Sequence, residues 1–206
     1  MGQIKCIGNF LLEVFDVRSY CKALKPSITF PFPWKPLWKP KVPTKVSLFI
    51  WTAALRKILT VDNLRRRKLV VVDWCCMCKR NGETLDHLLL HCPISQELWN
   101  IVCFLFGVHW VMPHSLVELI ASWSQKFHKP KTKVLWSMIP HCLMWVIWRE
   151  RNTCTFEGDE RSIHELKHFF FQTLYEWANA SGDVNFISLP DMIFFPNIYL
   201  LLIKNI

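Results

Sequence analysis

The sequence has little that marks a catalytic or phosphate-binding site. No Ser-His-Asp or Cys-His arrangement, no Walker motif and no glycine-rich phosphate loop stands out from the background of the chain. Such chemistry needs particular side chains at fixed spacings, because a nucleophile must meet its base and a phosphate must meet several N–H donors. We therefore do not expect an enzyme.

Targeting and membrane-spanning segments are also missing by the usual criteria. The first 21 residues carry four charges and no long apolar centre, unlike a secretory signal peptide. The apolar stretch 186–206 contains two prolines, so it falls short of a run of about 20 apolar residues that spans a membrane. We expect an intracellular protein, in the nucleus or the cytoplasm, that is not secreted and does not enter a membrane.

The composition indicates a folded protein from a reducing compartment. Hydrophobic residues make up 51% of the 206 residues and aromatic residues 14%, which excludes a disordered chain as the overall description. The nine cysteines are an odd number, and three of them lie within residues 75–78. A secreted disulfide framework fits this pattern poorly, whereas metal-bound thiolates fit it well.

The most specific pattern is a cysteine–histidine cluster. Its candidate donors are Cys75, Cys78, His87, His91 and Cys92, with the spacing C-x2-C-x8-H-x3-H-C. Zn²⁺ favours four sulfur or nitrogen donors, and a CxxC turn supplies two thiolates from one tight loop. The simpler alternative is a set of buried free thiols and core histidines. The spacing favours a structural Zn²⁺ site, which indicates binding rather than catalysis.

The fourth donor is open between His91 and Cys92. The H-x4-C ending resembles that of the retroviral zinc knuckle, with a longer middle loop, and favours Cys92. Pro93 should interrupt the helix that carries both histidines, so that Cys92 becomes the N-cap of a new helix. This break would turn the Cys92 thiol back toward His87. We interpret Cys76 as a bystander.

The remaining pattern predicts a mainly α protein, with a small zinc-stapled module followed by aromatic-rich helices. Residues 26–43 hold six prolines and should form an extended connector with at most a helical turn at 34–39. A short strand is expected at 69–72, leading into the metal site. Helices are expected from Thr44 to about 58, after Thr60 as an N-cap, from Thr84 to 91, from Pro93 to about 106, at about 133–154 and at 162–178.

Positive charge is concentrated in the first part of the chain. Residues 1–80 contain 16 Lys or Arg against four Asp or Glu, a net charge of +12, whereas the rest carries a net charge of −3. The cations nearest the cluster are Arg65, Arg66, Arg67, Lys68, Lys79 and Arg80. They could contact phosphates, or they could simply solvate a helix end, where cations suit the helix dipole. Trp34 and Trp38 could stack on bases, but tryptophans at such spacing are more often core anchors.

Several motifs, in the same order, resemble one family. They are Phe15-Asp-Val-Arg-Ser-Tyr20, Pro33-Trp34-Lys35 with Trp38, Val42-Pro43-Thr44-Lys45-Val46 with Trp51, Ile58-Leu59-Thr60-Val61-Asp62-Asn63-Leu64, and the cysteine–histidine cluster. Together they resemble the zinc-binding domain that follows the reverse transcriptase in plant non-LTR (LINE-type) retrotransposons. Residues 135–156, with Trp148-Arg-Glu-Arg-Asn152, resemble the downstream segment of the same elements.

The resemblance implies Zn²⁺ as the cofactor, with Cys75, Cys78, His87 and Cys92 as its ligands. It also implies a nucleic-acid-associated role beside a polymerase, in gripping template RNA or target DNA. The chain has no Asp-Asp dipeptide of the kind that a polymerase uses for its metals, and no room for an endonuclease. We expect a non-catalytic fragment of a decayed retrotransposon that binds RNA or DNA weakly and without sequence preference.

The alternative is a protein-interaction module, whose aromatic helices dock on a reverse transcriptase domain absent from this chain. In either case we divide the chain in the same way. Residues 1–14 are unassigned, residues 15–105 form the zinc-binding domain, residues 106–180 form a helical extension, and residues 181–206 form an apolar tail of poor order.

Overall fold

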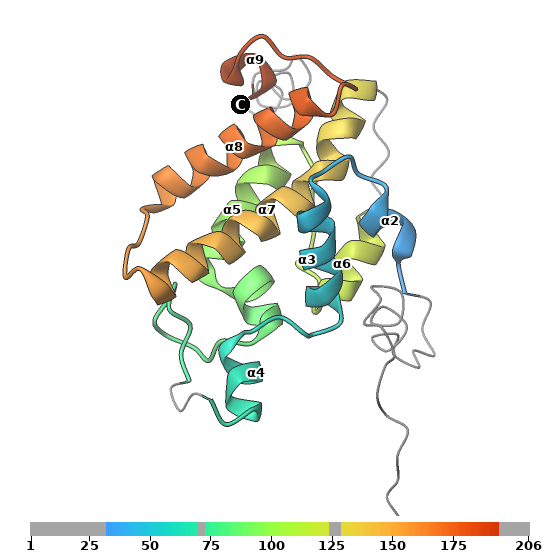
Figure 1. Ribbon diagram of the computed structural model, residues 1–206. Helices are drawn as coiled ribbons and strands as arrows, with labels where there is room; N and C mark the ends of the chain where they lie inside the picture. Colours follow the sequence, from blue (N-terminus) through green and yellow to red (C-terminus); the bar gives the residue numbers. More distant parts are fainter. Residues whose placement is uncertain (1–31, 70–72, 124–128, 194–206) are drawn as a thin grey trace, which may run out of the picture. The chain divides into compact units, whose positions relative to one another are not determined.

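The computed structural model describes residues 32–69, 73–123 and 129–193. These residues belong to the unit that begins at Phe32. Within the described ranges the chain forms helices and loops but no strand, which confirms the prediction of a mainly α protein (Figure 1). The strand predicted at 69–72 lies outside these ranges except for Leu69, and the motif at 15–20 lies outside them altogether. The elements, in chain order, are α2 (Trp34–Trp38), α3 (Thr44–Ala54), α4 (Val61–Arg66), η1 (His87–His91), α5 (Pro93–Leu105), α6 (Leu116–Ser122), α7 (Pro130–Phe156), α8 (Ile163–Ala180) and α9 (Leu189–Ile193).

From residue 32 on, the proline-rich segment contains one short helix, α2, at the predicted place. Pro36 lies in its first turn, where a missing N–H breaks no helical hydrogen bond. Leu37 is fully buried, and its carbonyl oxygen lies 2.9 Å from Nε2 of the buried His141 on α7. This contact anchors the connector to the centre of the fold.

The long helix α7 holds the other elements together. Its 27 residues contact α3, α5, η1 and α8, and Figure 1 shows α8 running alongside it. Because helices pack on several of its sides, α7 buries residues around most of its circumference, including Ile139, Cys142 and Leu143. The segment that carries the cysteine–histidine cluster therefore shares a core with the later helices.

Pro140 lies inside α7 without ending the helix. A proline has no N–H to offer to the carbonyl four residues earlier, which is that of Trp136. That carbonyl instead accepts a hydrogen bond from the Trp123 indole N–H at 2.8 Å. The two indole rings also stack, with centroids 4.2 Å apart and an interplanar angle of 10°. Trp123 thus replaces the donor that Pro140 lacks.

The helix α8 begins with a capping box. The Ser162 hydroxyl oxygen accepts from the Glu165 N–H, and the Glu165 carboxylate accepts from the Ser162 N–H at 2.7 Å. Beyond α8 the chain folds back: Asn179 Oδ1 accepts from the Phe186 N–H at 2.9 Å, and Phe186 is buried. Residues 181–193, where we expected poor order, thus pack on α8, and residues 194–206 lie outside the described part.

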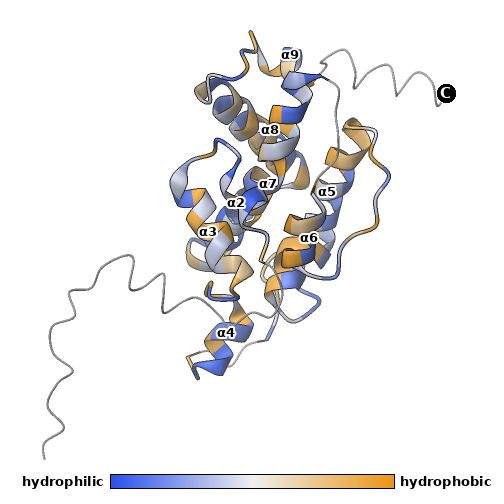
Figure 2. Cartoon of the chain, turned by 90° about the vertical axis from the view of Figure 1, so that its right-hand side faces the viewer, coloured by the Kyte–Doolittle hydropathy of each residue, from blue (hydrophilic) through white to orange (hydrophobic). Residues whose placement is uncertain are grey.

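The helix α4 stands apart from the core. None of its residues is buried, and Figure 2 colours much of it as hydrophilic. Thr60 is its N-cap and Arg65 and Arg66 are in its last turn, both as predicted. Across residues 32–69, 73–123 and 129–193, no helix joins the length and the apolar character that a membrane span requires.

Candidate metal centre

The chain from Cys75 to Asn81 folds into a tight turn that presents two thiols. The Cys75 N–H donates to the Asn81 carbonyl at 2.7 Å, and the Lys79 N–H donates to the Cys75 carbonyl at 2.8 Å. Lys79 adopts the left-handed backbone conformation, with φ of 54°, which is uncommon for a residue with a side chain. This conformation closes the turn directly after Cys78, so both thiols come from one short loop.

The second pair of donors comes from a single wide helical turn. Thr84 Oγ1 accepts from the His87 N–H at 3.1 Å and so caps the helix start. The Cys92 N–H then donates to the His87 carbonyl at 2.6 Å, a hydrogen bond between residues five apart that marks a π-helical turn. The helix expected to carry both histidines is therefore a π turn at this point, and the wider turn brings Cys92 rather than His91 over His87.

Pro93 ends this turn and starts α5, which confirms the predicted break. It lies in the first turn of α5, where its missing N–H leaves no bond unmade. Cys92 is the N-cap, with ψ of 133°, the extended conformation that the residue before a proline favours. The helix direction therefore changes at Cys92, and its thiol joins the earlier donors.

Four of the predicted side chains meet at one point. One ligand atom from each of Cys75, Cys78, His87 and Cys92 lies within 4.8 Å of the other three. Cys78 Sγ is 3.3 Å from Nε2 of His87. Zn–S bonds of about 2.3 Å and Zn–N bonds of about 2.0 Å place the donors of a tetrahedral site about 3.5–3.8 Å apart. Three sulfurs and one imidazole nitrogen within 4.8 Å of one another fit Zn²⁺ in number and in chemistry.

The four candidate ligands also hydrogen-bond to one another, and this arrangement suits a bound cation. A hydrogen bond to Cys92 and burial raise the pKa of Cys75 to about 12. The same hydrogen bond lowers the pKa of Cys92, and the N–H groups of Ile94 and Ser95 at the start of α5 lower it further. Contacts with the Cys75 and Cys78 sulfurs raise the pKa of His87. A metal ion would take the place of these protons, because thiols bind metals as thiolates.

The other two candidates of the cluster lie outside this group of four. His91 Nε2 is 3.1 Å from the His114 carbonyl oxygen, and the two rings meet edge to face with centroids 6.4 Å apart. The Cys76 thiol lies 3.7 Å from the Arg151 carbonyl oxygen and accepts from the Thr155 hydroxyl at 3.5 Å. The geometry thus favours Cys92 as the fourth ligand and Cys76 as a bystander, and the ligand set stays a prediction.

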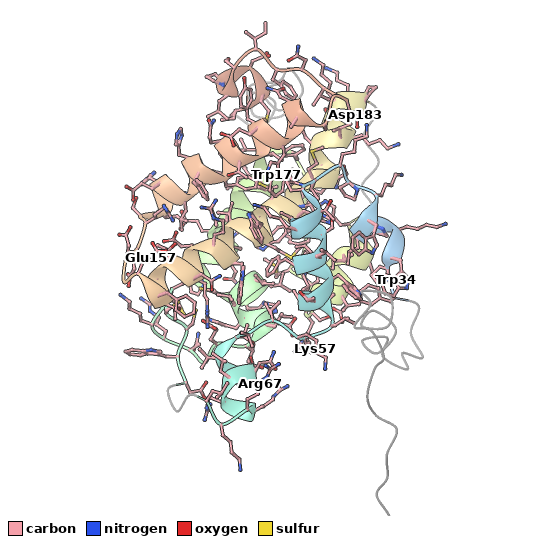
Figure 3. All side chains as sticks on the ribbon, in the orientation of Figure 1. Trp34, Lys57, Arg67, Glu157, Trp177 and Asp183 are labelled. Atoms are coloured by element: carbon pink, nitrogen blue, oxygen red, sulfur yellow. The ribbon has the colours of Figure 1, made fainter. Side chains whose placement is uncertain are left out.

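The six cations predicted to contact nucleic acid fall into two groups. Three of them form ion pairs: Arg65 with Asp73, Arg66 with Asp62 at 3.4 Å, and Lys79 with Glu160 at 2.7 Å. The other three are Arg67, Lys68 and Arg80, which are exposed and have no ion-pair partner among the residues that the structure describes. Figure 3 labels Arg67 at the end of α4.

A buried ion pair that sequence reasoning missed ties the metal-binding segment to α7. Arg151 Nη2 lies 2.8 Å from Glu83 Oε1, and the two side chains are 3% and 0% exposed. The Arg151 Nε–H also donates to Glu83 at 3.1 Å, and the Val61 N–H donates to the same carboxylate at 2.9 Å. One carboxylate therefore joins the start of α4, the loop before η1, and α7. The one signal in the sequence was the motif at 148–152, which contains Arg151 but gives no hint of its partner.

Comparison with known proteins gives an independent view of the same segment. Residues 15–99 match the family described as zinc-binding in reverse transcriptase. A curated protein of Arabidopsis thaliana, named as a ribonuclease H protein, is 33% identical over 63 residues. This match covers 31% of the present chain and 10% of that protein, so the chain spans only a small part of its relative. No solved structure matches the chain. The matched residues 15–99 include all four converging donors.

Proposed function

We propose that this chain is a non-catalytic, zinc-stapled module of retrotransposon origin that binds RNA or DNA through the cationic side of its metal centre. One observation carries the proposal. The Arg65–Asp73 ion pair fastens the cationic end of α4 to the chain that enters the CxxC turn. Three exposed cations, Arg67, Lys68 and Arg80, therefore flank the metal-binding loop and are available to phosphates.

In this account Zn²⁺ is structural. Cys75, Cys78, His87 and Cys92 would hold it, and the ion would close the loop against the start of α5. Four protein ligands fill the usual coordination number of zinc, so no position remains for a reactive water. Side chains of the protein, rather than the ion, would contact the nucleic acid. The turn after Cys78 sets the position of Lys79 and Arg80, and the ion pairs of α4 set the position of Arg67.

The name of this relative indicates the kind of protein in which the matched segment occurs, and does not indicate an activity of this chain. That protein is described as a ribonuclease H protein, and the chain covers 10% of it. We infer that the matched segment serves as an accessory module in proteins of the reverse transcriptase type. Purified protein should therefore show no polymerase, nuclease or ribonuclease activity with Mg²⁺ or Mn²⁺.

A protein-interaction role is the second candidate, and one observation favours it. Phe104 on α5 and Phe156 at the end of α7 are 63% and 77% exposed, although both are large apolar residues. Helices with such residues could dock on a polymerase domain. This role predicts no salt-dependent binding to nucleic acid.

Binding of a labelled single-stranded RNA, followed by fluorescence anisotropy at several salt concentrations, separates the two candidates. Each phosphate contact contributes about −0.7 to the slope of log K against log salt. The triple variant Arg67→Gln, Lys68→Gln, Arg80→Gln should flatten the slope by about 2 if all three contact phosphates. The matched control is Lys35→Gln, Lys133→Gln, Arg149→Gln, which removes the same charge from other exposed positions. Equal slopes for both variants, or no binding of the wild type at low salt, would contradict the proposal.

A further inference from the structure

Trp74 is largely exposed, and packing does not explain why a tryptophan stands at this position. It directly precedes the predicted zinc ligand Cys75, and it is 56% exposed. Two other tryptophans, Trp34 and Trp38, have comparable exposure, but each has a ring neighbour. The Trp34 ring lies 4.5 Å from that of Phe32, and the Trp38 ring lies 6.5 Å from that of Trp51. Among the residues that the structure describes, Trp74 has no such ring contact and no cation over its ring.

The backbone around Trp74 is held firmly although its side chain is not. On one side, Asp73 pairs with Arg65 of α4 and lies close over Gly82, where an added Cβ would be 3.0 Å from Asp73 Oδ1. On the other side, the Cys75 N–H donates to the Asn81 carbonyl at 2.7 Å. A large side chain on a fixed backbone loses little conformational freedom when it meets a ligand, so this site is suited to binding.

Exposed cations are connected to the Trp74 segment by the turn after Cys78 and by the Arg65–Asp73 ion pair. Arg80 is the residue before Asn81, whose carbonyl holds Cys75, and Arg67 and Lys68 follow the helix that Asp73 fastens through Arg65. An exposed aromatic face beside cations matches a nucleic acid strand with unpaired bases, because bases stack on the ring while phosphates meet the cations. A duplex offers its phosphates in the same way, but its bases already stack on one another.

We propose that Trp74 is a base-stacking platform that makes the module prefer single-stranded over double-stranded nucleic acid. This inference rests on the proposed function and adds to it the class of ligand. Trp74 distinguishes single strands from duplexes, and the cations determine how strongly binding depends on salt. The prolines and tryptophans of the connector at 32–43 have no part in it.

The test compares a fluorescein-labelled oligouridine of 12 nucleotides with a labelled 12-base-pair duplex at one salt concentration. Trp74→Ala should weaken binding to the oligouridine by about 5- to 150-fold, the range reported by alanine substitution of stacking residues, and should leave duplex binding within about twofold. Trp74→Phe should keep most of the affinity, because phenylalanine still offers a ring. Trp34→Ala is the control for loss of an exposed tryptophan elsewhere, and zinc content and melting temperature check that each variant is folded.

The outcomes separate this inference from the proposed function. If Trp74→Ala binds the oligouridine as the wild type does, while the cation variant still flattens the salt slope, the stacking role is wrong and the proposed function stands. An equal loss of affinity for oligouridine and duplex also contradicts stacking. If the wild type binds neither probe at low salt, both proposals fail together.

Discussion

Arg151 reaches Glu83 across 68 residues of sequence, and both side chains are almost completely buried. Two nitrogens of the guanidinium bond to one carboxylate, which also accepts from the Val61 N–H. The pair is the polar junction between the metal-binding segment and α7. Its role is to fix how the metal-binding segment and α7 pack on each other. A buried ion pair stabilises a fold little more than apolar packing would, but removing only one of the two partners is costly.

Removing one partner of this pair should destabilise the fold strongly. Arg151→Met leaves the Glu83 carboxylate buried without its partner, and we expect a loss of about 3–5 kcal/mol in the free energy of unfolding. The double variant Glu83→Gln, Arg151→Met should recover a large part of that loss. Urea denaturation measures both. Lys167→Met is the control, because its ion pair with Glu97 is partly exposed and should contribute only about 0–1 kcal/mol. A single variant as mild as this control would contradict the assigned role.

The Trp123 indole N–H should matter because of Pro140. Trp123→Phe removes the donor to the Trp136 carbonyl, and we expect a cost of about 1–3 kcal/mol in unfolding free energy. In a Pro140→Ala background the helix regains an N–H for that carbonyl, so the cost of Trp123→Phe should fall. A double-mutant cycle isolates this coupling from the packing of the indole. Additive effects of the two substitutions would show that the hydrogen bond does not compensate for the proline.

The capping box of α8 predicts a specific pH dependence. Hydrogen bonds from the Ser162 hydroxyl and then from the Ser162 N–H lower the pKa of Glu165 below its ordinary value of 4.5. The ionised carboxylate therefore adds stability above pH 4.5, and this contribution is lost as the pH falls through the lowered pKa. Glu165→Gln lacks that titration. The stability difference between wild type and variant should be constant near neutral pH and shrink below about pH 4.5.

Melting temperatures of the two proteins, recorded across this pH range, measure the difference. Acid also protonates the thiolates of the metal centre, but both proteins carry that site, so its effect cancels. A difference in melting temperature that grows as the pH falls would contradict the stabilising role of Glu165 in the capping box.

The sequence predicted those features that depend on local rules. Pro93 cannot continue a helix, and so the break at Cys92 and the start of α5 could be placed to the residue. Thr60 marked a helix start for the same kind of reason, since threonine can cap a helix. The helix expected at 162–178 begins where Ser162 forms the N-cap of α8. The order of cysteines and histidines likewise picked out the donors that the structure brings together.

Two local features and one contact between more distant residues were not predicted. The π turn from His87 to Cys92 differs from an α turn by one residue of hydrogen-bond register, which no propensity distinguishes. The short helix α6 was missed, although Ser115 caps it and accepts from the Glu118 N–H. The passage of α7 through Pro140 depends on Trp123, a residue 17 positions earlier whose indole no sequence rule would place there.

The central claim, that Cys75, Cys78, His87 and Cys92 hold one structural Zn²⁺, is tested most directly by the zinc content of purified protein. Mass spectrometry of the metal should find one zinc per chain in the wild type, in Cys76→Ser and in His91→Ala. Serine in place of Cys75, Cys78 or Cys92, or alanine in place of His87, should release the zinc and lower the melting temperature, because binding energy at such sites is folding energy. A metal-free wild type with unchanged melting, or a His91→Ala variant that loses zinc while Cys92→Ser keeps it, would contradict the account.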